Sequence, residues 1–431
     1  MSYMHFFNEL PALINVSLTF ALILTAHRLK VQLSLALFIG ALVLGLLMGL
    51  PILKIPVLMV QSLVDPMVIS LVLIVTAILI LSKLMSDSGQ LDRIVSNFSN
   101  ITQNVRAVAA VMPALIGLLP MPGGALFSAP MVEAATGQMD LDANLKTAIN
   151  YWFRHIWECW WPLYPGVILA VSLLGVETWR FILVQIPLTF FAVGSGFFFL
   201  LRSIPAKNPT KNDPGPVRRN WAAFFNEIQP ILLVVLAIPL ITIFEMVSGL
   251  DLPRMTSVFT GLCLSLIWVI GQNRIPLVKV RQTVLDKAIL PMLFLILGIM
   301  AFKGILIESQ AVEQIHGELT QYGIPPLLVI LLLPFLSGFI TGIAIGFVGA
   351  SFPLIVPLLA QSQGLDFLAH AFLAYAAGFM GMMLSPVHLC LLVTRDYFQA
   401  NLVKSYGLLV KPVAGFITCT LLLFGLFQLI D

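Results

Sequence analysis

Long apolar runs recur along the whole chain, and they constrain its fold more than any other feature. Of the 431 residues, 59% are hydrophobic and 10% are charged, whereas about 25% of residues are charged in soluble domains. A spanning helix needs about 20 mostly apolar residues. The sequence therefore predicts an all-α polytopic membrane protein with about ten transmembrane helices. The expected spans are 11–27, 33–51, 57–82, 160–177, 179–201, 228–248, 255–271, 284–305, 366–384 and 406–430.

Two further apolar regions, 107–137 and 325–361, fit neither one span nor two. Glycine and proline interrupt each near its middle, in the stretches PMPGGA and TGIAIGFVGASFP. A broken helix exposes backbone N–H and C=O groups that are costly in lipid. Each region is therefore expected to be a re-entrant hairpin whose tip is buried in protein. If only one such cluster were present, a kinked helix packed tightly on a neighbouring helix would be the alternative to a hairpin.

Residues of the second half of the chain resemble those of the first half at an offset of 221 residues. The two glycine-rich clusters fall at corresponding places, which favours hairpins over kinked helices. Each half contains five crossings, an odd number, so the halves are expected to be inverted repeats. Asp65 and Asp286 are more readily interpreted as helix caps than as ion ligands. The matched pairs are Asp65 and Asp286, Ser88 and Ser309, Pro113 and Pro334, Gly117 and Gly338, and Ala129 and Ala350.

The repeat divides the chain into two halves and a linker. The first repeat, 1–201, contains scaffold spans 11–82, hairpin 107–137, broken span 142–177 and closing span 179–201. The linker is 202–227. The second repeat, 228–431, contains scaffold spans 228–305, hairpin 325–361, broken span 366–398 and closing span 406–430.

The linker also predicts the orientation in the membrane. Residues 202–220 contain five Lys and Arg, which places the linker in the cytoplasm by the positive-inside rule. Both termini are then expected outside a cell inner (cytoplasmic) membrane. The amphipathic segments 86–104 and 307–322 are expected to lie along the membrane interface as connecting arms.

The first broken span carries the most charged intramembrane stretch, NYWFRHIWECWWPLYPG. Asn150, Arg154 and Glu158 are four residues apart, which predicts one helical face before a break at Pro162. Arg154 and Glu158 can pair there, and His155 can titrate near neutral pH. Ionisable groups at membrane depth are functional candidates. The alternative places the basic groups at headgroup level within an aromatic belt of four tryptophans.

The second broken span, with the motif SPVHLC, offers Ser385 and His388 next to Pro386. His388 is equally consistent with proton transfer or binding and with a structural role. Helix N-termini at the breaks and tips favour an anion. Gly123 and Gly124 would let such a ligand approach the backbone closely.

Other site chemistries have little support. The four cysteines stand singly, without CxxC or HExxH motifs, so they are interpreted as packing residues and no metal site or cofactor is expected. No catalytic triad order is present, so the protein is not expected to be an enzyme. A net charge of +3 is small for this length and indicates no nucleic-acid partner.

At these motifs the chain resembles a known group of proteins. PMPGGALFSAPMV, NYWFRHIWE, WPLYPG, GFVGASFPLI and SPVHLCLLVTRDYF are similar to those of an uncharacterised family of prokaryotic integral membrane proteins. That family is placed in the ion transporter superfamily with gluconate permeases, citrate and dicarboxylate carriers and sodium/proton antiporters. The resemblance covers nearly the whole chain. The Ser-Asn-Thr tip signature of sodium-coupled dicarboxylate carriers is absent.

The resemblance implies an elevator-type movement against a dimeric scaffold, coupled to H⁺ or Na⁺, with substrate held at the hairpin tips and broken helices. The substrate-binding positions are then expected in 122–125, 161–165, 346–351 and 385–388. The candidate substrate-binding residues are Pro122, Gly123, Gly124, Ala125, Ser128, Arg154, Tyr164, Gly346, Gly349, Ser351, Ser385 and His388. His155, Glu158 and His388 are the candidates for proton or ion coupling.

The sequence thus predicts a secondary active transporter of a small organic anion, a carboxylate, in a lipid bilayer and as a homodimer. One alternative is a cation/proton antiporter in which Glu158 and unwound carbonyls bind a cation. The other is a membrane enzyme acting on lipid, for which Ser385 and His388 are the only close pair.

Overall fold

The computed structural model describes residues 10–99, 101–102, 104–121, 124–136, 139, 141–205, 220–359 and 364–430. Every regular element in those ranges is a helix. Six helices are long and apolar enough to cross a membrane, or seven if the bent pair Glu313–Gln321 and Pro326–Thr341 counts as one span. The expected ten spans are not confirmed by this measure, because several apolar helices have fewer than 18 residues.

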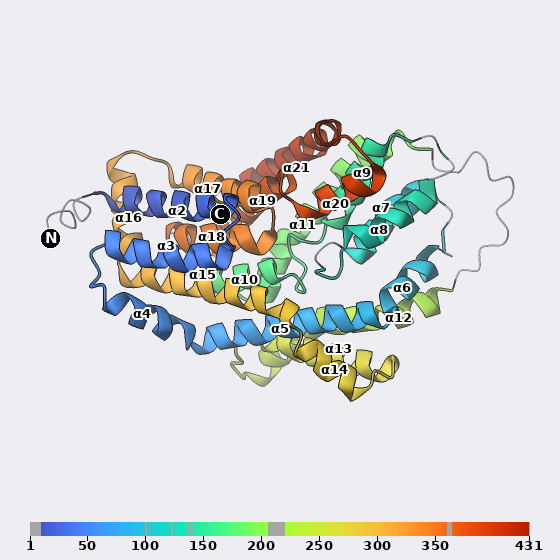
Figure 1. Cartoon of the computed structure of the whole chain (residues 1–431), viewed down its shortest axis with the longest axis horizontal. Helices are drawn as coiled ribbons and strands as arrows, with labels where there is room; N and C mark the ends of the chain where they lie inside the picture. The colour runs from blue at the N-terminus through green and yellow to red at the C-terminus, as the bar shows by residue number, and fades with distance from the viewer. Residues whose placement is uncertain are drawn as a thin grey trace.

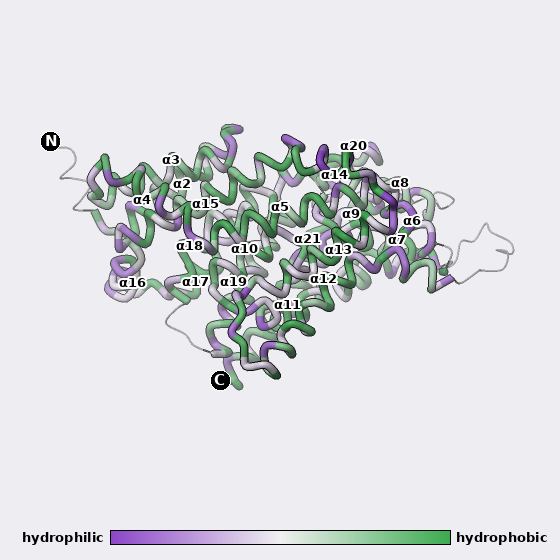
Figure 2. Tube along the Cα trace, turned by 90° about the horizontal axis from the view of Figure 1, so that it is seen from below, coloured by the Kyte–Doolittle hydropathy of each residue, from purple (hydrophilic) through white to green (hydrophobic). Residues whose placement is uncertain are grey.

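Two long helices have apolar surfaces that the protein itself leaves largely uncovered. In α12 (Trp221–Ser248) and α21 (Leu402–Ile430), only 22% and 17% of the most apolar window is buried. Figure 2 shows hydrophobic residues along the central helices and hydrophilic ones gathered at helices such as α16. A helix that is apolar all round needs lipid or protein around it. The fold therefore fits a polytopic membrane protein.

The order of helices is the same in both halves, so that each helix of the first half has a counterpart numbered ten higher in the second. The first half contains α2 (Ala12–Arg28), α3 (Leu33–Leu47), α4 (Lys54–Leu63), α5 (Pro66–Asp87), α6 (Gln90–Ser99), α7 (Val105–Ile116), α8 (Ala125–Thr136), α9 (Ala143–Arg154), α10 (Pro165–Leu174) and α11 (Thr178–Gly196), which the π-helix η1 (Phe197–Leu201) continues. The second contains α12, α13 (Thr256–Gln272), α14 (Leu277–Val284), the 3-10 helix η2 (Lys287–Ile289), α15 (Leu290–Glu308), α16 (Ala311–Gln321), α17 (Pro326–Thr341), α18 (Ala344–Leu359), α19 (Gly364–Met383), α20 (Leu389–Phe398) and α21.

Local details recur at the 221-residue offset. Asp65 and Asp286 each accept a hydrogen bond from the backbone N–H two residues on, at 2.7 and 2.9 Å, so both are helix caps as predicted. Gly89 and Gln310, which follow α5 and α15, both adopt the left-handed conformation, with φ of 69° and 53°. Glycine adopts this conformation freely, whereas glutamine does so only when the surrounding structure requires it.

The two halves exchange packing partners. Helix α3 packs on α15 of the other half, and α5 packs on α13; α10 packs on α18, and α8 on α20. Figure 1 shows α2, α3 and α15 side by side. Lys83 near the end of α5 pairs with Asp286, just before α15. At the other end, Gly304 of α15 lies against the side chain of Ser62, just before α5, so the neighbouring helices α5 and α15 run antiparallel.

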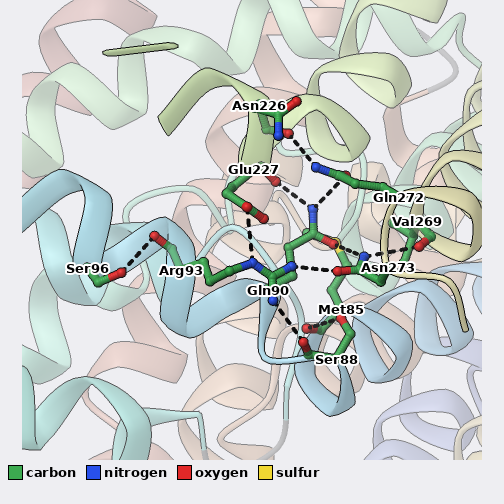
Figure 3. A network of polar contacts seen from close by, with 10 residues as sticks. All are labelled: Met85, Ser88, Gln90, Arg93, Ser96, Asn226, Glu227, Val269, Gln272 and Asn273. Carbon is green, nitrogen blue, oxygen red and sulfur yellow. Dashed lines mark hydrogen bonds and ion pairs between the residues drawn. The ribbon is translucent and has the colours of Figure 1, made fainter. Parts of the chain in front are cut away.

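A polar network joins α6 to the start of α12 and the end of α13 (Figure 3). The Arg93 Nε atom lies 3.0 Å from Glu227 Oε1, and Arg93 Nη2 donates to Asn273 Oδ1 at 2.5 Å. Gln90 links the two partners, because it donates to the Glu227 carbonyl at 2.7 Å and accepts from Asn273 at 2.9 Å. The counterparts of α6 and α12 in the other halves, α16 and α2, are also joined. Glu318 of α16 accepts hydrogen bonds from the first two N–H groups of α2, at 2.6 and 2.7 Å.

Candidate functional site

The first broken span breaks earlier than predicted. Helix α9 ends at Arg154, and residues 155–164 form turns before α10 begins at Pro165. The expected helical face therefore holds for Asn150 and Arg154 but is wrong for Glu158. Tertiary contacts hold the unwound chain, since the Tyr375 hydroxyl donates to the Glu158 carbonyl at 2.9 Å. In the second half, α19 ends at Met383 and α20 begins at Leu389, within the broken span predicted there.

Both glycine-rich regions form helical hairpins. Helices α7 and α8 pack on each other, as do α17 and α18. The second tip is a two-residue turn at Gly342 and Ile343, in which Gly342 has φ of 65°. Pro122 and Gly123 of the first tip lie outside the described residues, whereas Gly124 and Ala125 begin its second arm.

Aromatic side chains satisfy the carbonyl groups at the end of α7. Trp157 Nε1 donates to Ala114 O at 2.9 Å. Trp161 Nε1 donates to Leu118 O, also at 2.9 Å. The Tyr164 hydroxyl donates to Gly117 O. Both tryptophans therefore act as donors to freed backbone carbonyls of the first hairpin.

The two tips and the two breaks surround one cavity of about 190 Å³. Five of the predicted site residues line it, and Cys390 joins them. The backbone of both hairpin tips contributes as well, at 120–121 and 342–345. The polar side chains of the lining are Arg154, His155, Glu158, Tyr164, His388 and Cys390.

Three helices present their N-termini to this cavity, namely α10, α18 and α20. The caps of α10 and α20 are Tyr164 and His388, and neither side chain bonds to its own helix terminus. The first N–H groups of an α-helix have no intrahelical partners and carry partial positive charge. The cavity is therefore suited to a negatively charged group.

Arg154 brings a full positive charge to the cavity. Its side chain is 3% exposed, and Nη2 donates to Met121 O at 2.9 Å. Neither Nε nor Nη1 has a hydrogen-bond partner. Within the described part of the chain no carboxylate lies within 4.0 Å of the guanidinium, so the expected pairing with Glu158 is not formed. Two buried donors are left for a ligand.

Two histidines from opposite halves meet in the cavity wall. His155 Nε2 lies 3.1 Å from His388 Nε2. The other ring nitrogens face backbone carbonyls, with His155 Nδ1 2.6 Å from Tyr151 O and His388 Nδ1 3.3 Å from Met382 O. Glu158 Oε1 lies 3.8 Å from His155 Nε2. All three predicted coupling residues thus form one cluster.

The other predicted residues that the structure describes do not line the cavity. Ser128 and Ser351 donate to carbonyls of their own helices, at 3.3 and 2.6 Å. A Cβ at Gly349 would lie 2.2 Å from the Ile299 side chain, so this glycine serves close packing against α15. The ring nitrogens of His388 contact Met382 O and His155 Nε2 and do not contact the Ser385 hydroxyl, with which His388 was considered as a catalytic pair. The predicted residues outside the cavity lining are Gly124, Ala125, Ser128, Gly346, Gly349, Ser351 and Ser385.

Sequence reasoning missed Cys390, which it interpreted as a packing residue. The thiol is buried, lines the cavity, and lies with the two histidine rings in a cluster whose ligand atoms are all within 4.8 Å of one another. The local signal was the spacing His388-x-Cys390 directly after a helix break. The third member of the cluster, His155, lies 233 residues before His388 and could not be found by spacing.

The sequence was compared with those of known protein families, and one family matches. Residues 12–427 match the family described as "Protein of unknown function (DUF401)". Since the match covers nearly the whole chain, the chain belongs to this family. A search of curated proteins finds no match.

Proposed function

We propose that this DUF401 member is a secondary active transporter that moves a small organic anion, such as a carboxylate, by coupling it to a proton or sodium gradient. The observation that carries the proposal is the buried Arg154 guanidinium in the cavity wall, two of whose donor nitrogens have no hydrogen-bond partner.

The charge of Arg154 requires a partner. Burying an unpaired charge is costly, and buried polar groups are almost always hydrogen-bonded. A carboxylate in the cavity would accept a charge-assisted hydrogen bond from Nε or Nη1, which is stronger than a bond between neutral groups. The N-termini of α10, α18 and α20 would add to the attraction. The cavity volume of about 190 Å³ is below the roughly 300–1,000 Å³ of drug-sized pockets, which supports a small solute.

The histidine pair supports coupling to protons. Contact with a carbonyl oxygen suits an N–H at each Nδ1, which leaves both Nε2 lone pairs facing each other at 3.1 Å. One added proton converts this repulsive contact into a hydrogen bond. Glu158, 3.8 Å from His155, would balance the resulting positive charge. The cluster would therefore hold a proton beside the anion and release it when the surroundings change.

The architecture supports alternating access. The antiparallel α5 and α15, the exchanged packing partners and the equal helix order are what inverted repeats predict. In the proposed arrangement the hairpins and broken spans move as a transport unit against α2 to α5 and α12 to α15. The protein would be a homodimer in the cytoplasmic membrane, with the linker 202–227 in the cytoplasm and both termini outside.

Uptake by proteoliposomes tests the proposal. The purified protein is screened with labelled small carboxylates, with and without pH and sodium gradients. Arg154→Gln is expected to reduce uptake at least about thirty-fold, or about 2 kcal/mol, because it removes a buried charged partner. The matched control is Arg395→Gln, since Arg395 pairs with Asp396 outside the cavity. If neither gradient drives anion flux, the proposal is wrong.

A cation/proton antiporter is the second candidate, favoured by the buried Glu158 carboxylate in the cavity wall. In that case sodium or potassium alone would dissipate a pH gradient across the same liposomes, and Glu158→Gln would abolish the effect. Dissipation that requires a carboxylate supports the anion transporter instead.

A further inference from the structure

We propose that His155, His388 and Cys390 form a binding site for a divalent transition-metal ion of the zinc type. The site goes beyond the proposed anion transport and does not depend on it. It would join the unwound stretch after α9 to the N-terminus of α20, and thus the two halves of the chain.

The donor atoms are those that such an ion prefers. Imidazole nitrogen and thiolate sulfur bind zinc, commonly as four ligands around a tetrahedral ion. The Nε2 atoms of His155 and His388 are 3.1 Å apart, whereas a tetrahedral ion with Zn–N bonds of about 2.0–2.1 Å holds two nitrogens about 3.3 Å apart. The Cys390 Sγ atom lies within 4.8 Å of both. Rotation of the cysteine side chain can close the remaining distance.

The tautomers are set by the surroundings of the rings. A metal-bound histidine usually donates its other N–H to a carbonyl or carboxylate, which fixes the ring and directs its lone pair at the ion. Both rings meet this condition, because the Nδ1 atoms of His155 and His388 face the carbonyls of Tyr151 and Met382. Both Nε2 lone pairs are then free to bind an ion after a small rotation of the rings.

The fourth coordination position and an entry route lie in the cavity. Glu158 Oε1 is 3.8 Å from His155 Nε2, but only the ligand atoms of His155, His388 and Cys390 lie within 4.8 Å of one another, so water, a solute or a displaced Glu158 carboxylate would be the fourth ligand. All four side chains line the cavity, and a hydrated ion or a ligand-bound ion can therefore reach them without unfolding of the core. The bound ion would lie in the same cavity as Arg154 and would displace protons from the thiol and from the histidine pair.

Metal binding to the purified full-length protein tests the site. Titration with Co²⁺ is expected to give one ion per chain and a thiolate-to-cobalt charge-transfer absorption band, and Zn²⁺ should displace the Co²⁺. Binding should weaken as the pH falls, because acid protonates the ligands. Loss of a ligand in His388→Ala or Cys390→Ser should weaken Zn²⁺ binding about 100-fold or more, since even outer partners contribute about 10–100-fold.

Three controls make the result specific. Cys159→Ser removes another buried thiol, and His370→Ala removes a histidine that pairs with Asp366 outside the cavity; both should bind as the wild type does. Cys390→His supplies a different ligand, so it should retain Zn²⁺ binding but lose the charge-transfer band. Melting temperatures of all variants in detergent identify any that fail to fold.

The outcome separates this site from the proposed transport. Arg154→Gln should lose anion uptake and keep metal binding, because Arg154 is not a ligand. Absence of binding by the wild type, or binding that Cys390→Ser and His388→Ala leave unchanged, overturns the site while the transport proposal stands. Metal binding with no anion flux in any condition overturns the transport proposal alone.

Discussion

The guanidinium of Arg154 lies directly against the backbone of Gly124, so that a Cβ on Gly124 would be 2.3 Å from Nη2 and 2.7 Å from Cζ. The guanidinium can therefore hold this position only because residue 124 has no side chain. This contact links the glycine-rich motif to the charge that we assign to anion binding.

Gly124→Ala is expected to displace the arginine and lower anion uptake by about tenfold or more, because shifts on the order of 1 Å at a positioning group can cost about 100-fold. Uptake by proteoliposomes measures the loss. Gly271→Ala in α13 is the matched control, since a Cβ there has no neighbour within 4 Å. Equal losses in both variants would contradict the role of the tip.

The histidine pair predicts a defect in coupling. In His388→Gln the bridging proton has no second imidazole, so a pH gradient should no longer accelerate anion uptake, while exchange of labelled for unlabelled anion continues. The two assays are run on the same liposomes. A variant that still responds to the gradient as the wild type does would remove His388 from the coupling pathway.

Trp161→Phe tests the donors that hold the first hairpin. The substitution leaves the buried carbonyl of Leu118 without its 2.9 Å hydrogen bond, and an unsatisfied buried acceptor costs about 1–3 kcal/mol. The melting temperature in detergent should fall. Trp221→Phe is the control, because Trp221 is 47% exposed; it should melt close to the wild type.

The ion pair of Arg93 and Glu227 predicts a measurable coupling between the halves (Figure 3). Because Arg93 is partly exposed, the coupling energy in a double-mutant cycle of Arg93→Met and Glu227→Gln should be about 0.5–1 kcal/mol. Unfolding in detergent measures it. A coupling energy of zero would mean that the ion pair adds no stability and that other hydrogen bonds, such as the one from Gln90 to the Glu227 carbonyl, hold α6 to α12.

The proposed inverted arrangement predicts that equivalent positions face opposite sides of the membrane. Val64 and Leu285 are 221 residues apart, precede the capping aspartates and are 64% and 66% exposed. In a cysteine-free background, Val64→Cys should react with a membrane-impermeant maleimide in intact cells, and Leu285→Cys only after lysis. Reaction of both from the same side would exclude inversion.

Much of the architecture could be predicted from the sequence because its determinants are local. The apolar runs located the helices, and Asp65 and Asp286 marked helix starts through bonds to residues two positions away. The two hairpins followed from glycine and proline, which act on their own backbone.

The candidate site was less predictable because its determinants are tertiary. Nothing in residues 155–161 is a strong helix breaker, so the end of α9 at Arg154 was missed. The bonds from Trp157 and Trp161 to α7 and the meeting of Cys390 with His155 join residues far apart in sequence. Helix ends were also misplaced, since hydrophobicity alone does not locate them: α12 begins at Trp221 and α21 at Leu402, before the expected spans 228–248 and 406–430.

The exchange of packing partners has a consequence for biosynthesis. Helix α3 finds its main partner, α15, only after more than half of the chain has been translated, and α5 must wait for α13. Synthesis proceeds from the N-terminus, and domains usually fold as they emerge. The N-terminal half of this chain cannot complete its assembly in that way. We therefore expect the N-terminal half to remain an unfinished intermediate until the C-terminal half has been inserted beside it.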